Sequence, residues 1–160
     1  MKSQWRRTAA WLALALLVAM LDQFSKMAVA TVLQPGQSIV VAPFFSLVLW
    51  FNKGAAFSFL ANAAGWQREL LIGIALVASV VIVWMLKRHS AETLFCVALS
   101  LILGGALGNL WDRVLHGHVL DFLLFHAGTW YWPAFNLADS AITLGAGLAI
   151  LDSFRHRPPA

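Results

Sequence analysis

The segment Gly104 to Phe122, GGALGNLWDRVLHGHVLDF, decides the fold because polar residues enter it at the end of a long apolar run. The preceding stretch, Leu94 to Leu103, predicts a membrane helix. The segment then brings in four polar side chains, Asn109, Asp112, Arg113 and Asp121. Ionisable groups at membrane depth are costly and usually mark function. We therefore expect the functional site at the end of this helix.

A second acid follows in Phe135 to Ile142, FNLADSAI, inside another apolar run. The polar side chains here recur at i, i+3, i+4 and i+7, which places Asn136, Asp139, Ser140 and Thr143 on one helix face. Two carboxyl groups brought to the same depth can share a proton, an arrangement that activates water. We predict that Asp121 and Asp139 form this catalytic pair.

Three polar residues near the two acids, Asn109, Asn136 and Arg113, admit two interpretations. Their side chains can orient the substrate or nearby loops by hydrogen bonding. They can equally serve as helix caps and as packing groups where the spans end.

The composition predicts a membrane protein. Of the 160 residues, 61% are hydrophobic and 11% are charged, and the mean hydropathy is +0.77. A soluble domain carries about a quarter charged residues, so this chain has too little polar surface to face water. The net charge of +4 is spread over chain ends and loops, which argues against nucleic-acid binding. Cys96 is the only cysteine, and we expect a buried thiol.

We predict an all-α integral membrane protein with four transmembrane helices, a small extramembrane β-cradle and a short interfacial helix, all in one domain over residues 1–160. The expected spans are about 8–33, 69–87, 93–114 and 134–152. Residues 34–67 form the expected cap. Within it, 38–51 is rich in β-branched and aromatic residues, which favours short strands. The segment 55–62 is too short to cross the membrane, so we expect it to lie in the interface.

The first span carries a polar face. Asp22, Ser25 and Lys26 lie at i, i+3 and i+4. An Asp22–Lys26 ion pair can simply neutralise both charges in lipid. Alternatively, this face supports the functional site.

The third span carries small residues. Gly104 and Gly108 form a small-xxx-small face that favours close helix contact. Gly105, Asn109 and Arg113 step by four residues along a neighbouring face.

The basic residues predict the orientation. Seven fall on one side of a four-span arrangement: Lys2, Arg6, Arg7, Lys87, Arg88, Arg155 and Arg157. Four fall on or near the other: Lys26, Lys53, Arg68 and Arg113. Both termini are therefore expected in the cytoplasm, with the acids toward the outer face.

Other polar groups have plainer interpretations. Asp112 is expected to be solvated at the helix end. The spacing of His116, His118 and His126 is weak for a metal site, so we expect no metal. Two alternatives to an enzyme remain at this point: a small proton- or ion-coupled transporter, and a scaffold for other membrane proteins.

Five stretches together make the chain resemble the type II signal peptidases, bacterial enzymes that process prolipoproteins. They are Asp22–Lys26 (DQFSK), Phe51–Phe57 (FNKGAAF), Gly104–Arg113 (GGALGNLWDR), Gly117–Phe122 (GHVLDF) and Phe135–Ile142 (FNLADSAI). The resemblance implies an aspartyl endopeptidase that cuts just before a cysteine carrying diacylglycerol. By motif position it implies that Asp121 and Asp139 are catalytic. It implies substrate binding or site support for Asp22, Asn52, Gly54, Asn109, Arg113, Asn136 and Ala138. The helix faces described above suggest the same role, substrate binding or site support, for Lys26, Gly105 and Ser140.

The resemblance also implies the surroundings of the protein. We expect a multi-pass protein of the bacterial inner membrane, monomeric, with its site toward the periplasm. The expected partners are a lipidated prolipoprotein, membrane lipids and a cyclic peptide inhibitor of the globomycin type. No cofactor is expected.

Overall fold

The computed structural model describes residues 2–54 and 66–155, and four long helices dominate it. They are α1 (Lys2–Val32), α2 (Gln67–Arg88), α3 (Thr93–His116) and α4 (Leu137–Arg155). Within the described residues, all four are long and apolar enough to cross a membrane. This confirms the four expected membrane helices by length and composition. α1 begins well before residue 8, and α4 begins at Leu137 rather than near residue 134.

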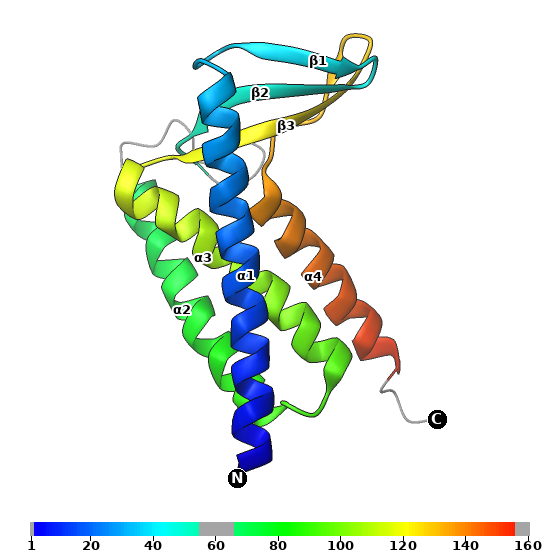
Figure 1. Cartoon of the computed structure of the whole chain (residues 1–160). Helices are drawn as coiled ribbons and strands as arrows, with labels where there is room; N and C mark the ends of the chain where they lie inside the picture. The colour runs from blue at the N-terminus through cyan, green and yellow to red at the C-terminus, as the bar shows by residue number, and fades with distance from the viewer. Residues whose placement is uncertain (1, 55–65, 156–160) are drawn as a thin grey trace.

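A four-stranded antiparallel sheet lies across one end of the helices, and the N-terminus lies at the other end (Figure 1). Its strands are β1 (Ser38–Ala42), β2 (Phe45–Asn52), β3 (Val119–Ala127) and β4 (Trp130–Tyr131), in that order. The sequence predicted strands only within residues 34–67. The chain is therefore not strictly all-α, because a second stretch, after α3, completes the sheet. The expected interfacial helix at 55–62 lies outside the described residues.

Strand β3 follows directly from the end of α3. Gly117 ends the helix with φ of 75°, a left-handed conformation that glycine adopts without strain. Val119, Phe122 and Leu124 are then buried against the rest of the protein. Their burial supplies the packing that makes this segment a strand, although Asp121 and His126 interrupt its apolar pattern in the sequence.

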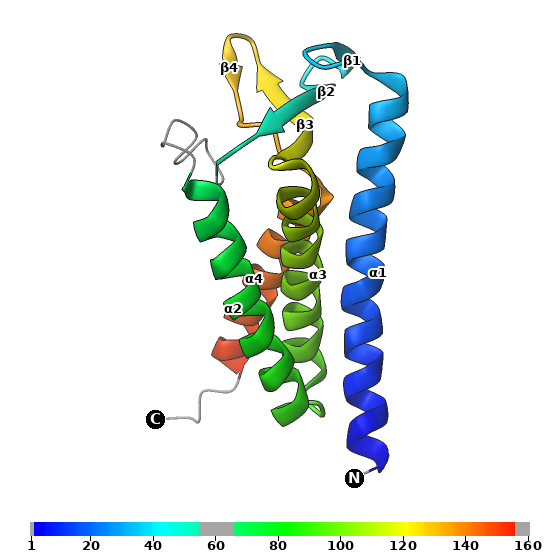
Figure 2. The same ribbon diagram turned by 90° about the vertical axis from the view of Figure 1, so that its left-hand side faces the viewer.

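α3 is the central helix, and it packs against α1, α2 and α4 (Figure 2). Glycines allow this close approach. A Cβ atom built on Gly104 would lie 2.5 Å from the backbone oxygen of Ala15 in α1. A Cβ atom on Gly105 would overlap the backbone oxygen of Ala138 in α4. The small-residue face therefore contacts α1, and Gly105 on the neighbouring face brings α4 close.

We expect Gly105→Ala to lower the free energy of unfolding by about 1 to 2 kcal/mol, because the added methyl group overpacks the α3–α4 contact. Unfolding in detergent micelles measures this change. Gly147→Ala is the matched control, since a Cβ atom there has nothing within 4 Å. In an open helical position, alanine is favoured over glycine by about 1 kcal/mol. Equal effects of the two substitutions would show that the α3–α4 contact is not tight.

Candidate active site

Asp121 and Asp139 come from different elements and meet at one asparagine. Asp121 lies in β3 and is 3% exposed, and Asp139 lies in the first turn of α4. Asn136 Nδ2 donates to Asp121 Oδ1 at 2.8 Å. The backbone N–H of Asn136 donates to Asp139 Oδ2 at 3.2 Å. Asn136, which is fully buried, therefore bridges the two carboxyl groups.

The start of α4 explains why Asn136 and Asp139 keep this geometry. Asn136 precedes the first helical residue, and its Oδ1 accepts a hydrogen bond from the backbone N–H of Asp139 at 2.9 Å. Asp139 returns the contact by accepting from the backbone N–H of Asn136. This reciprocal arrangement is a capping box. It fixes Asp139 at the helix start, where the helix dipole favours a negative charge.

Asn52 holds the other oxygen of Asp121. In the antiparallel pairing of β2 and β3, Trp50 lies opposite Asp121 and Asn52 lies opposite Val119. Asn52 and Asp121 are thus diagonal neighbours on one face of the sheet. Asn52 Nδ2 donates to Asp121 Oδ2 at 3.0 Å.

Asn109 of α3 holds Asp139 from the opposite side. Its Nδ2 donates to Asp139 Oδ1 at 2.8 Å, and its Oδ1 accepts from Asn136 Nδ2 at 3.3 Å. Three asparagine amides, from β2, α3 and the start of α4, therefore fix the two carboxyl groups.

The electrostatics favour a proton on Asp121. Burial and, to a smaller extent, the nearby charge of Asp139 raise the pKa of Asp121 to about 7. Hydrogen bonds from Asn52 and Asn136 act in the opposite direction, because they stabilise the ionised form. Near neutral pH, the pair can therefore hold one proton and one negative charge.

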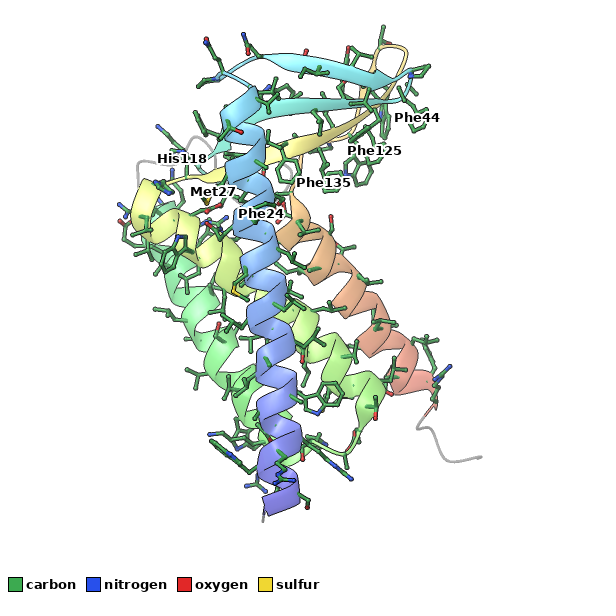
Figure 3. All side chains as sticks on the ribbon, in the orientation of Figure 1. Phe24, Met27, Phe44, His118, Phe125 and Phe135 are labelled. Carbon is green, nitrogen blue, oxygen red and sulfur yellow. The ribbon has the colours of Figure 1, made fainter. Side chains whose placement is uncertain are left out.

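A cleft of about 460 Å³ opens beside the acids. Asp121 and Asp139 line it together with Arg113, Ser140 and other residues of β3, α3 and α4. Phe135 forms part of its wall and stacks on Phe125 with ring centroids 5.9 Å apart. Figure 3 shows both rings below the sheet, beside the start of α4. Thr143 and Leu144 extend the lining along α4. The cleft therefore reaches from the acids into the membrane-spanning part of the protein.

A buried charge cluster lies behind the acids. Lys26 Nζ lies 2.7 Å from Asp22 Oδ2 and 2.7 Å from Asp112 Oδ2. Lys26 and Asp112 are each 4% exposed. The prediction that Asp112 is solvated was therefore wrong, because α1 covers it and Lys26 neutralises it. The expected Asp22–Lys26 ion pair is present.

The charge cluster connects to the acids in two places. Lys26 Nζ donates to Asn109 Oδ1 at 3.1 Å. Asp22 Oδ1 accepts from the backbone N–H of Ala138 at 2.9 Å, so α1 caps the start of α4. Asp22 and Lys26 therefore neutralise each other, and each also makes a hydrogen bond to a residue beside the acids.

Arg113, Gly54 and Ser140 complete the surroundings. Arg113 Nη2 donates to the Gly54 backbone oxygen at 3.0 Å, and the Gly54 N–H donates to Asn52 Oδ1 at 2.9 Å. Arg113 thus holds the end of β2 next to α3. Ser140 Oγ donates to the Asn136 backbone oxygen at 2.9 Å and lines the cleft.

The sequence missed Gln23 and the role of Asp112. Gln23 Nε2 donates to Asp112 Oδ1 at 2.9 Å and to the Gly108 backbone oxygen at 3.2 Å. The proximity of Gln23 to Asp22 was the available signal. Gly108 allows α1 to approach at this point, since a Cβ atom there would lie 2.5 Å from Asp22 Oδ2.

The histidines do not gather at one point. His116 and His118 have ring centroids 6.2 Å apart, whereas His126 Nε2 lies 2.9 Å from Ser46 Oγ. Burial lowers the pKa of His118, and the neighbouring His116 lowers it further. Among the described residues, no group of three or more His, Cys, Asp or Glu side chains could hold a metal ion.

Comparison with known proteins gives one consistent family. The family described as signal peptidase (SPase) II matches residues 14–155. A lipoprotein signal peptidase of Paraburkholderia phymatum is 56% identical over 148 residues, which cover 92% of this chain and 89% of the relative. One from Cupriavidus taiwanensis is 57% identical over 146 residues, covering 91% and 83%. Two solved structures, both described as bacterial membrane enzymes, match with TM-scores of 0.82 and 0.80 at 29% and 30% identity. The first covers 95% of both chains, and the second covers 93% of this chain and 95% of the other.

Proposed function

The chain belongs to the signal peptidase II family of multi-pass membrane proteases, and we propose that Asp121 and Asp139 carry out its peptide hydrolysis. The substrate class is a prolipoprotein whose signal peptide is removed by a cut just before a diacylglyceryl-modified cysteine. The observation that carries this proposal is the pair of acids joined by Asn136 at a cleft. Membership of a peptidase family favours hydrolysis over the alternative of ion-coupled transport.

In this mechanism, Asp121 holds the shared proton and Asp139 is ionised. Asp139 removes a proton from a water molecule as the oxygen attacks the scissile carbonyl carbon, while Asp121 donates its proton to the carbonyl oxygen. The resulting tetrahedral intermediate then breaks at the C–N bond. The leaving nitrogen receives the proton held by Asp139, and Asp121 recovers a proton from the intermediate as the new carboxyl group forms. Both acids return to their starting states, and no covalent intermediate forms.

The asparagines act as positioning residues in this mechanism. Asn109 donates to Asp139, and Asn52 donates to Asp121. Because Asn136 donates to both acids, it keeps them on one side of the cleft. Lys26 fixes the amide of Asn109, since it donates to Oδ1 and leaves Nδ2 to face Asp139.

The shape of the cleft supports a lipidated substrate. Its lining continues from the acids to Thr143 and Leu144 of α4, a helix apolar enough to span the membrane. A peptide segment can therefore reach the acids while its acyl chains remain between the helices. The same cleft is the proposed binding site of a globomycin-type cyclic peptide.

The proposed location is the bacterial inner membrane, with a monomeric protein, both termini in the cytoplasm and the sheet in the periplasm. The excess of basic residues at the ends of the helices opposite the sheet supports this orientation.

The function is tested with purified protein in detergent and two peptides of the same sequence. One peptide carries diacylglycerol on its cysteine and the other is unmodified. We expect cleavage just before the cysteine, with the unmodified peptide cut at least about 100-fold less efficiently, because binding energy from the acyl chains supports the reaction. A chelator should have no effect. Cleavage elsewhere, or equal cleavage of both peptides, would refute the assigned substrate.

The pH dependence should show loss of the Asp121 proton. The mechanism needs Asp121 protonated, and its pKa is raised to about 7. Below that pH the proton is present. Above it, kcat/KM should fall by about tenfold per pH unit, because only the protonated fraction reacts. The measured value belongs to the coupled pair of acids. A profile that stays flat from pH 6 to pH 9 would contradict this assignment of the proton.

A further inference from the structure

Residues at the start of α1 and in the connection from α2 to α3 line a polar cavity of about 310 Å³. Both segments lie at the end of the helices opposite the sheet (Figure 1). Arg7 and Arg88 line the cavity. Among its described lining residues, Glu92 is the one carboxylate, and it pairs with His89 at 2.8 Å. Among the described residues, neither arginine forms an ion pair with a carboxylate. The cavity therefore carries excess positive charge and suits an anion.

An apolar groove of about 470 Å³ lies next to this cavity, closer to the middle of the helices. α1 and α2 form its sides and α3 contributes the rest, through residues that include Leu12, Leu16, Val80, Val83, Leu103 and Leu107. Lys87 and Trp84 line the end of the groove near the cavity. The Arg88 guanidinium lies 5.4 Å from the centre of the Trp84 ring. Gln4 Nε2 donates to the Lys87 backbone oxygen at 2.8 Å and ties α1 to α2 at this point.

The two cavities together match one kind of molecule. A phosphate group suits the arginines, because guanidinium groups bind phosphate through paired hydrogen bonds. An acyl chain suits the groove, which is almost wholly apolar. A phospholipid carries both parts, and basic pockets between membrane helices bind anionic head groups.

The substrate of the proposed function does not fit this site. Signal peptides begin with a positively charged segment, which excess positive charge would repel. The site also lies at the opposite end of the helices from the cleft at Asp121 and Asp139. We propose that the cavity and the groove bind one anionic phospholipid of the leaflet opposite the candidate active site. Its phosphate lies between Arg7 and Arg88, and one acyl chain lies between α1 and α2.

The proposal is tested by measuring lipid affinity of the full chain in detergent, with dioleoylphosphatidylglycerol as the probe. Native mass spectrometry separates the lipid-bound protein from the free protein. We expect the double variant Arg7→Gln/Arg88→Gln to bind this lipid about thirtyfold more weakly than the wild type. Its thermal unfolding without lipid should be unchanged, because both arginines are exposed. Arg6→Gln is the control for lost charge, since it removes one positive charge, half as many as the double variant, from a residue next to Arg7 that does not line the cavity. It should change the affinity by less than about threefold.

Two further probes separate the head group from the chain. Dioleoylphosphatidylcholine tests the need for negative charge, and inorganic phosphate tests the need for acyl chains. If phosphatidylcholine and inorganic phosphate both bind more weakly than the anionic lipid, the result supports the proposed site. Three results would overturn it: equal affinity for the two lipids, phosphate binding as tight as that of the anionic lipid, or equal losses in Arg6→Gln and the double variant.

Discussion

Asp121→Asn and Asp139→Asn should each lower kcat for cleavage of a lipidated peptide by at least about 1,000-fold, while KM changes little. Asparagine keeps the shape of the side chain but cannot exchange a proton at neutral pH. In Asp139→Asn, the side-chain oxygen can still accept from the backbone N–H of Asn136, so the start of α4 is preserved. In Asp121→Asn, the residue imitates a neutral acid that cannot give up its proton. Because the acids act as a unit, the double variant should be hardly slower than either single variant.

Thr143→Val is the matched control for these variants. Thr143 lines the same cleft, and valine has nearly the same shape. We expect less than about a tenfold loss of kcat, because Thr143 exchanges no proton in the mechanism. Thermal unfolding in detergent checks that all variants are folded. If Asp121→Asn or Asp139→Asn kept more than about a tenth of wild-type turnover, the proposed mechanism would be wrong.

The sequence could predict the membrane helices and the polar face of α4, because both depend on local patterns. The polar stripe from Asn136 to Thr143 shows which face of α4 must avoid lipid. The spacing of Asp22 and Lys26 predicted their ion pair. These features need only the helix period and the cost of charge in an apolar solvent.

Strand β3 and the burial of Asp112 in the charge cluster could not be predicted from local patterns. β3 forms because its side chains pack beside β2, and that partner lies far away in the sequence. Asp112 looks exposed at the end of a helix until α1 packs across it. Gly108 allows that approach, but one glycine does not reveal which helix it faces. Contacts between distant segments, rather than local propensity, therefore decide this part of the site.

Asn109 connects the charge cluster to the acids, so the cluster has both a structural and a functional effect. Its Oδ1 accepts from Lys26 Nζ, and its Nδ2 donates to Asp139 Oδ1. If Lys26 no longer donates, only the longer hydrogen bond from Asn136 Nδ2, at 3.3 Å, holds Oδ1 in place. The amide can then rotate more easily and present its oxygen to Asp139. Two acceptors would then face each other, and Asp139 would lose a hydrogen bond that stabilises its ionised form.

We therefore expect Lys26→Met to lower the free energy of unfolding by about 3 to 5 kcal/mol, because Asp22 and Asp112 would be left as buried charges without their cation. Unfolding in mixed detergent micelles measures the loss. Lys53→Met is the control for removing a lysine charge, since Lys53 is exposed, and it should cost less than about 1 kcal/mol.

Adding Asp112→Asn to Lys26→Met separates stability from catalysis. It removes one of the two unpaired charges, so it should restore part of the stability. It does not restore the donor to Asn109, so kcat should stay at least about tenfold below that of the wild type. Recovery of kcat in parallel with stability would show that Lys26 acts on the fold alone. A Lys26→Met protein as stable as the wild type would refute the ion pairs on which this argument rests.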